Sequence, residues 1–225
     1  MSRRWFLKLA IGLILVAATV LIHDWQNQAA TPRLDQLSGD AATTLAKLPV
    51  KGRAPKTDYS REQFGNGWET VGVCDVREQI LRRDLTNIRL DSDRCTVLSG
   101  QLLDPYTAQI ILFKRGVTTS SDVQIDHIVA LSDAWQKGAQ GLSFSQRRAF
   151  ANDPLELLAV DGGANQQKSD GDAATWLPEN KTFRCSYVAR QIAVKFKYHL
   201  WVTAAERDAM TRVLNNCPDQ PLPSS

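Results

Sequence analysis

The chain has few of the side chains on which common metal and nucleophilic sites are built. Only three of its 225 residues are histidine, and its four cysteines include no Cys-x-x-Cys pair. A multi-histidine zinc site and a zinc ribbon are therefore excluded. The sequence also lacks a Gly-x-Ser-x-Gly elbow and a Gly-x-x-x-x-Gly-Lys-Ser/Thr loop, which excludes the α/β-hydrolase and P-loop classes.

Neither sign of charge is in large excess. The formal net charge is +3, and removing the three basic residues and one acidic residue of residues 1–30 leaves 24 basic and 23 acidic residues. Bulk charge gives no argument for nucleic-acid binding, so any basic surface must be local.

One long apolar run, Leu9 to Ile22, follows Arg3 and Arg4 and is followed by polar residues. This order is typical of an export signal, and the run is short for a full membrane span. We expect residues 1–30 to be a signal peptide or an N-terminal membrane anchor, with a buried helix as the alternative. The protein is then secreted or extracytoplasmic, and it contacts a membrane only through this segment.

Four cysteines in an exported chain suggest two disulfides, for which three connectivities exist. We favour Cys74–Cys95 and Cys185–Cys217, because each pair closes a short loop between neighbouring elements. If the export signal is wrong, four buried free thiols are the alternative.

Composition divides the rest of the chain. Residues 31–57 are rich in Ala, Thr and Pro, a composition that predicts a linker with at most one short helix. We expect the folded domain to span 58–217 and to be followed by a tail over 218–225. Hydrophobic spacing predicts helices over 76–88, 145–151 and 181–198 and after the Thr203–Glu206 capping box. Strands are predicted over 96–103, 109–114, 123–127 and 155–160.

The residues with most chemical content lie within 123–172. The first strand of this stretch ends in Asp126-His127, and a second strand and a Gly-Gly turn lead into a short helix with Asn165 and Lys168. A carboxylate, an imidazole and an amide oxygen thus come to the ends of short elements. These groups can hold one hard divalent cation and activate a water beside it.

Each of these residues also has an ordinary structural reading. Asp126-His127 alone is a strand-end pair in which a carboxylate orients a structural imidazole. Asn165 alone is a helix cap, and Lys168 alone is a solvated charge. The ordered set of all four favours a functional site.

The set resembles the HNH, or His-Me finger, nucleases, in which a ββα element grips one divalent metal. Other segments are similar to an exported bacterial HNH endonuclease family, whose catalytic part is similar to the C-terminal domain of GmrSD-type restriction endonucleases. These segments are Leu48–Thr57, Tyr59–Gly65, Cys74–Glu78, Asp104–Thr107, Asp126–Leu131, Phe150–Pro154 and Lys181–Cys185. The resemblance implies an α+β fold with a ββα-metal core, added helices and a β-hairpin.

The resemblance also implies roles for single residues. His127 matches the general base, and Asp126 and Asn165 match ligands of a divalent metal, most simply Mg²⁺, with Mn²⁺ or Ca²⁺ as alternatives. Lys168 is a further catalytic candidate. Glu156 stands where the family has an Asn that braces the loop bearing the histidine. An ionised Glu cannot donate a hydrogen bond, so it could brace differently, add a carboxylate near the metal, or weaken catalysis.

Four arginines are candidates for contacts with substrate phosphates, although each is equally well a solvated surface charge: Arg147, Arg148, Arg184 and Arg190. The implied activity is metal-dependent hydrolysis of phosphodiester bonds outside the cytoplasm, in DNA rather than RNA, with no protein partner. A catalytically weakened nucleic-acid-binding protein and a disulfide-bonded envelope interaction module are the alternatives.

Overall fold

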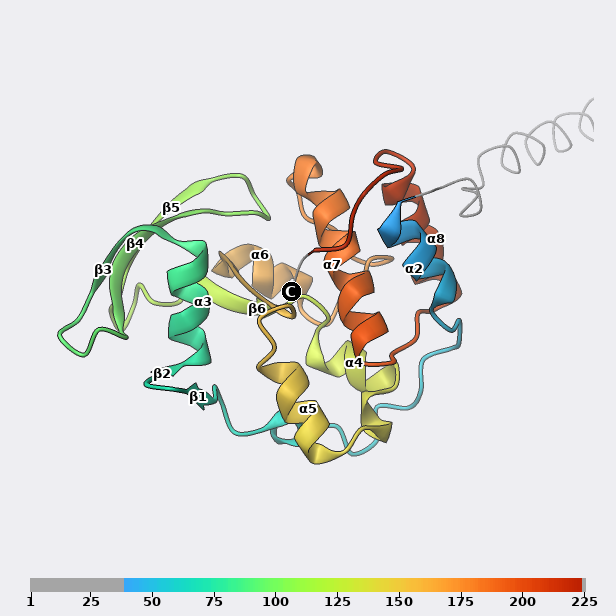
Figure 1. Ribbon diagram of the computed structural model, residues 1–225, viewed down its shortest axis with the longest axis horizontal. Coiled ribbons are helices and arrows are strands. Elements are labelled where there is room, and N and C mark those ends of the chain that lie inside the picture. Colours follow the sequence, from blue (N-terminus) through green and yellow to red (C-terminus); the bar gives the residue numbers. More distant parts are fainter. Residues whose placement is uncertain (1–38, 224–225) are drawn as a thin grey trace, which may run out of the picture. The chain divides into compact units, whose positions relative to one another are not determined.

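The computed structural model describes residues 39–223 (Figure 1). The expected export segment, residues 1–30, lies outside the described residues. Within 39–223, no helix combines the length and the apolar character needed to span a bilayer.

The described chain is a mixture of helices and short antiparallel sheets, which confirms the α+β class. The helices are α2 Asp40–Lys47, α3 Val76–Asp84, α4 Leu131–Gln136, α5 Phe144–Ala151, α6 Gly162–Lys168, α7 Arg184–Lys197 and α8 Ala204–Leu214, with 3₁₀ turns η2 Arg61–Phe64, η3 Ala139–Gly141 and η4 Lys181–Phe183. The strands are β1 Thr70–Val71, β2 Cys74–Asp75, β3 Thr86–Leu90, β4 Val97–Leu103, β5 Ile110–Lys114, β6 Val123–His127 and β7 Leu157–Asp161. They form the sheets β1-β2, β3-β4-β5 and β6-β7.

A two-stranded ribbon, β6-β7, lies at the centre of the fold. Its strands pair with Val123 opposite Asp161 and His127 opposite Leu157. The chain passes from β7 directly into α6, whose first turn is capped by the Asp161 carboxylate accepting from the Ala164 N–H at 2.7 Å. Gly162 is required at this junction, because a Cβ there would lie 2.1 Å from a backbone oxygen. The order strand, strand, helix predicted from the sequence is therefore present.

Both faces of the ribbon are buried, which explains why β7 is apolar from Leu157 to Val160. Leu157 and Ala159 pack in a cluster with α3 and the β3-β4-β5 sheet, whereas Leu158 and Val160 pack in a cluster with α2, α7 and α8. Figure 1 shows the ribbon between α3 and α7. A third cluster joins η2, α4 and α5 beside the end of β6.

One helix prediction was too long. The apolar spacing predicted a helix over 76–88, but α3 ends at Asp84 and the chain continues as β3, with Thr86 opposite Gln101. The β-branched side chains of Thr86 and Ile88 favour a strand over a helix, and pairing with β4 decides the outcome.

Part of the expected linker belongs to the folded unit. Within residues 39–57, α2 buries Ala41 and Leu45 against α7 and α8. The Ala41 N–H donates to the Gln220 carbonyl at 3.1 Å, so part of the segment expected to be a tail, 218–225, also packs here. Local composition could not reveal these contacts, because they join the two ends of the described chain.

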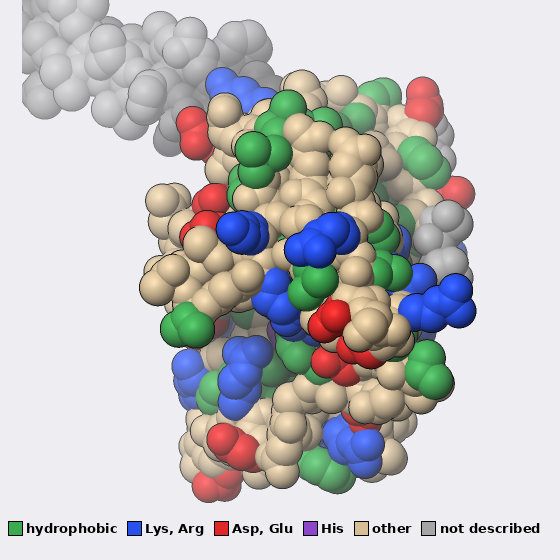
Figure 2. Space-filling model, turned by 90° about the vertical axis from the view of Figure 1, so that its left-hand side faces the viewer, with side chains coloured by type: hydrophobic (Ala, Val, Ile, Leu, Met, Phe, Trp, Pro, Cys, Tyr) green, Lys and Arg blue, Asp and Glu red, His purple; other side chains and the backbone are tan. Residues whose placement is uncertain are grey.

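Both favoured disulfides are present, Cys74–Cys95 and Cys185–Cys217. The first joins β2 to the loop before β4, and the second joins the start of α7 to the turn after α8. Figure 2 views the molecule from the side of the β3-β4-β5 sheet, where acidic and basic side chains form separate small groups among hydrophobic ones. This mixed surface agrees with the nearly balanced charge.

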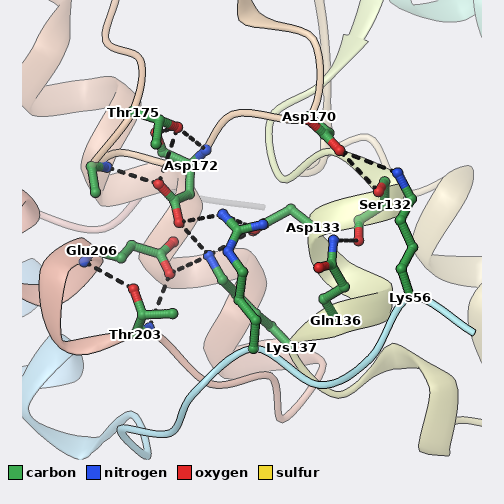
Figure 3. Close-up of polar contacts among 12 residues, drawn as sticks. Lys56, Ser132, Asp133, Gln136, Lys137, Asp170, Asp172, Thr175, Thr203 and Glu206 are labelled. Carbon is green, nitrogen blue, oxygen red and sulfur yellow. Dashed lines mark hydrogen bonds and ion pairs between the residues drawn. The ribbon is translucent and has the colours of Figure 1, made fainter.

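Next to the ribbon lies a buried cluster of charges (Figure 3). The Lys137 ammonium is 2.7 Å from Asp133, 2.7 Å from Asp172 and 2.6 Å from Glu206. Lys195 adds contacts of 3.2 Å to Asp133 and 2.9 Å to Glu206. The cluster joins α4, α7, α8 and the loop after α6, the elements that surround the end of β6.

Removing one of these lysines should destabilise the protein strongly. Lys195→Met leaves Asp133 and Glu206 buried with one ammonium fewer, and breaking a buried ion pair in this way costs about 3–5 kcal/mol. We expect Lys195→Met to lower the free energy of unfolding in urea by that amount. Lys47→Met, an exposed substitution of the same kind, should change it little, and equal losses in the two variants would contradict the role of the cluster.

Candidate functional site

Two adjoining cavities meet at the end of β6. The front cavity, of about 380 Å³, is lined by Asp126, His127 and Asn165 among others. The narrow cavity, of about 110 Å³, is lined by His127 and Trp68 among others, and Arg61 lines both. The three residues predicted to meet around a cation therefore face one space.

The environment of His127 defines which ring nitrogen can act as a base. Nε2 lies 3.0 Å from the Ala151 carbonyl oxygen, and a carbonyl can only accept, so Nε2 carries the hydrogen and Nδ1 holds the lone pair when the ring is neutral. Trp68 stacks on the imidazole, with ring centroids 5.6 Å apart and planes inclined by 10°. Burial lowers the pKa of His127 to about 3, so the ring is neutral at physiological pH.

The Asp126 carboxylate is held by hydrogen bonds from two side chains. Its Oδ1 accepts from the Lys168 ammonium at 2.8 Å, and its Oδ2 accepts from the Tyr106 hydroxyl. Lys168 also donates to the His127 carbonyl oxygen at 2.7 Å. Burial raises the pKa of Asp126, and Lys168 opposes that shift. Lys168 is 2% exposed, so the structure places it as a support of the Asp126-His127 segment.

Glu156 supports the segment that follows the histidine. Its carboxyl oxygens lie 3.1 and 3.2 Å from the Val129 N–H, and its backbone carbonyl accepts from the Ile128 N–H at 2.8 Å. Burial raises the pKa of Glu156 well above its usual value. Three alternatives were open for Glu156 in place of the family's Asn. These contacts correspond to the first of them, in which a carboxyl group supports the loop by hydrogen bonds other than those of an amide.

Asn165 lies on α6 at the front cavity. Its amide nitrogen donates to the Gln124 side-chain oxygen at 2.9 Å. This bond fixes which end of the amide is a donor and leaves the carbonyl oxygen as the group that can bind a cation.

Each of the four candidate arginines has a partner within the protein. Three donate a guanidinium N–H to a backbone carbonyl oxygen: Arg147, Arg184 and Arg190. Arg148 is exposed and forms an ion pair with Glu69. None of the four lines the front or the narrow cavity, so their prediction as phosphate contacts gains no support from this geometry.

Sequence reasoning missed several residues that surround His127. Lys56, Tyr59, Arg61 and Trp68 all come from the segment before β1, and no spacing pattern connects them to a histidine about sixty residues later. Tyr106 had a signal, because it lies in the Asp-Pro-Tyr-Thr turn that contributed to the resemblance. The same signal existed for Lys56, Tyr59 and Arg61, which lie in the similar segments Leu48–Thr57 and Tyr59–Gly65, but not for Trp68.

Comparison with known proteins places this geometry in a family. Residues 75–213 match the family model described as GmrSD restriction endonucleases, C-terminal domain. The chain is 39% identical over 207 residues to an "Uncharacterized secreted protein" of Arthroderma benhamiae, a match that covers 91% of this chain and 97% of that protein. That relative is fungal, so it does not support the expected bacterial origin. No solved structure matches the chain.

The low pKa of His127 couples protonation to unfolding. In the unfolded chain the imidazole titrates near pH 6.5, whereas in the folded protein it titrates near 3. Below about pH 6.5 the unfolded state therefore binds more protons, and stability is lost as the pH falls toward 3.

From about pH 7 to about pH 4, the wild type should lose about 3 kcal/mol more stability than His127→Gln, whose amide does not titrate. Urea unfolding without divalent metal measures this difference. Parallel pH profiles for the two proteins would show that His127 is not held neutral by burial.

Proposed function

The chain belongs to the family of the GmrSD restriction endonuclease C-terminal domain, and from that premise we propose that it is a metal-dependent endonuclease of the HNH type. It hydrolyses phosphodiester bonds of nucleic acid, DNA rather than RNA. The observation that carries the proposal is one cavity lined by a neutral imidazole, a carboxylate and an amide oxygen, His127, Asp126 and Asn165.

In this proposal His127 is the general base. Its Nδ1 accepts a proton from the attacking water, while the Nε2–H bond to Ala151 keeps the tautomer fixed. Trp68 covers one face of the ring and limits its rotation. The low pKa keeps the base unprotonated over the whole physiological range, and a phosphate bound nearby favours the imidazolium as the proton arrives.

The donor set fits one magnesium ion. Asp126 and Asn165 supply two oxygens, and each Asp126 oxygen retains a lone pair beside its present hydrogen bond. Within residues 39–223 no three His, Cys, Asp or Glu side chains form a group that could hold a metal, so water and phosphate oxygens complete the coordination. Mg²⁺ commonly binds in this way, and Mn²⁺ and Ca²⁺ accept the same ligands. A bound cation would polarise the phosphate and stabilise the leaving oxygen.

We place this activity outside the cytoplasm. Two disulfides are typical of oxidising compartments, and the fungal relative is named a secreted protein. The charged, apolar and polar order of the first residues supports export as well.

Replacing the base provides the direct test. His127→Ala should reduce cleavage of supercoiled plasmid in Mg²⁺ or Mn²⁺ by about a hundredfold or more, because general-base catalysis contributes that much. His199→Asn is the matched control, since His199 is exposed and has a positive φ of 54° that Asn tolerates. If wild type and His127→Ala leave plasmid equally intact in every metal, the protein is not the proposed enzyme.

The brace formed by Glu156 gives a second test, and it separates the enzyme from a weakened binding protein. Glu156→Gln keeps an acceptor for the Val129 N–H and should retain cleavage. Glu156→Ala leaves that buried N–H unpaired, at a cost of about 1–3 kcal/mol, and should lower both the melting temperature and the rate of cleavage. Glu179→Ala, at an exposed position that lines none of the cavities around His127, is the control. Cleavage by Glu156→Ala at the wild-type rate would show that Glu156 does not support the site.

A further inference from the structure

A third cavity extends the site past Trp68. This outer cavity, of about 310 Å³, is lined by Phe144 and Arg148, and it shares Gly65, Gly67 and Trp68 with the narrow cavity. The narrow and front cavities in turn share Arg61, His127 and Leu131. Because each cavity shares wall residues with the next, we take the three together as one groove, in which His127 lines the front and the narrow parts.

The charges along the groove are not equivalent. Lys56 is paired with Asp170 at 3.3 Å, and Arg148 is paired with Glu69. Arg61 is exposed, and among residues 39–223 its guanidinium forms neither an ion pair nor a hydrogen bond, although the charge of the neighbouring Glu62 interacts with it. It is therefore the cation of the groove with no carboxylate within ion-pair distance, and it lines both the front and the narrow cavities.

The narrow cavity is the smallest of the three parts of the groove. His127 is 7% exposed, and the narrow cavity beside it holds about four waters at roughly 30 Å³ each. A phosphodiester linkage fits such a space, and a base pair does not. Beyond the narrow cavity, the Phe144 ring is 50% exposed and has the Arg148 guanidinium 5.9 Å from its centroid. An exposed aromatic ring beside an arginine is a platform on which a single base can stack.

We propose that Arg61 binds the phosphate beside His127, and that the groove takes a single, unpaired nucleic-acid strand with a base on Phe144. This inference rests on the proposed nuclease function and deepens it. Both Trp68 and η2, which contains Arg61, precede residues 75–213, the part of the chain that matches the family model. This chain therefore adds a phosphate contact and one wall of the groove from outside the matched region.

Binding measured without cleavage tests the inference. The probe is a short fluorescein-labelled DNA oligonucleotide, free or annealed to its complement, titrated with full-length protein in EDTA over a range of sodium chloride concentrations. Wild type should bind the single strand more tightly than the duplex. Arg61→Gln should reduce the slope of log affinity against log salt by about 0.7, the value for one phosphate contact on a single strand. Arg61→Lys should retain most of the slope.

Two further variants complete the design. Arg207→Gln removes the same charge from a partly exposed side chain on α8 and should leave the slope unchanged. Phe144→Ala should weaken binding of the single strand about tenfold through lost stacking, and should affect the duplex much less. Thermal melts check that all variants fold. We expect the Arg61 variants to be stable, because the guanidinium has no hydrogen bond or ion pair within the described chain that the substitution would remove.

Plasmid cleavage by the same proteins separates this inference from the function on which it rests. If the wild type cleaves but Arg61→Gln keeps the wild-type slope, the Arg61 assignment is wrong and the nuclease function stands. If binding depends on Arg61 but no metal supports cleavage, the nuclease function is wrong and the assignment of the groove as a binding site for a single strand is retained. Equal affinity for duplex and single strand would overturn the assignment of an unpaired strand.

Discussion

The buried ion pair between Lys168 and Asp126 is the contact on which the geometry of the site depends. The ammonium also donates to the His127 carbonyl, so one side chain of α6 holds both residues at the end of β6. Moving α6 would leave a charge buried without its partner, which is costly in a protein interior. Asn165 lies one turn earlier on the same helix. The spacing of the imidazole and the oxygen-bearing side chains is therefore fixed by a side chain that lines neither the front nor the narrow cavity.

Local signals predicted much of the fold. Alternation predicted β6, the apolar run predicted most of β7, and the Thr203–Glu206 capping box predicted the start of α8. The order of these signals, with the resemblance, was sufficient to bring Asp126 and His127 together with a residue on α6. What the sequence could not predict is long-range packing, such as α2 against α7 and α8, because no local pattern records which distant element covers an apolar face.

Charged residues were the least predictable part of the site. Arg147 and Arg148 are neighbours in sequence, yet one is buried and donates to a backbone carbonyl while the other is exposed beside Glu69. Lys168 was a candidate for catalysis, and it is a buried partner of Asp126. Residue type gives the charge, but burial decides whether that charge serves the fold or is open to a ligand. Arg61 is of the second kind, since it is exposed and its guanidinium forms no ion pair or hydrogen bond within the described chain.

Glu156 shows how a departure from a family pattern can preserve its physical role. An asparagine amide can both accept and donate hydrogen bonds, whereas an ionised carboxylate can only accept. Burial raises the pKa of Glu156 well above its usual value. Its oxygens accept from the Val129 N–H behind the histidine. The accepting half of the asparagine's role therefore has a counterpart in this chain, and Glu156 in place of Asn is not by itself an argument for a weakened enzyme.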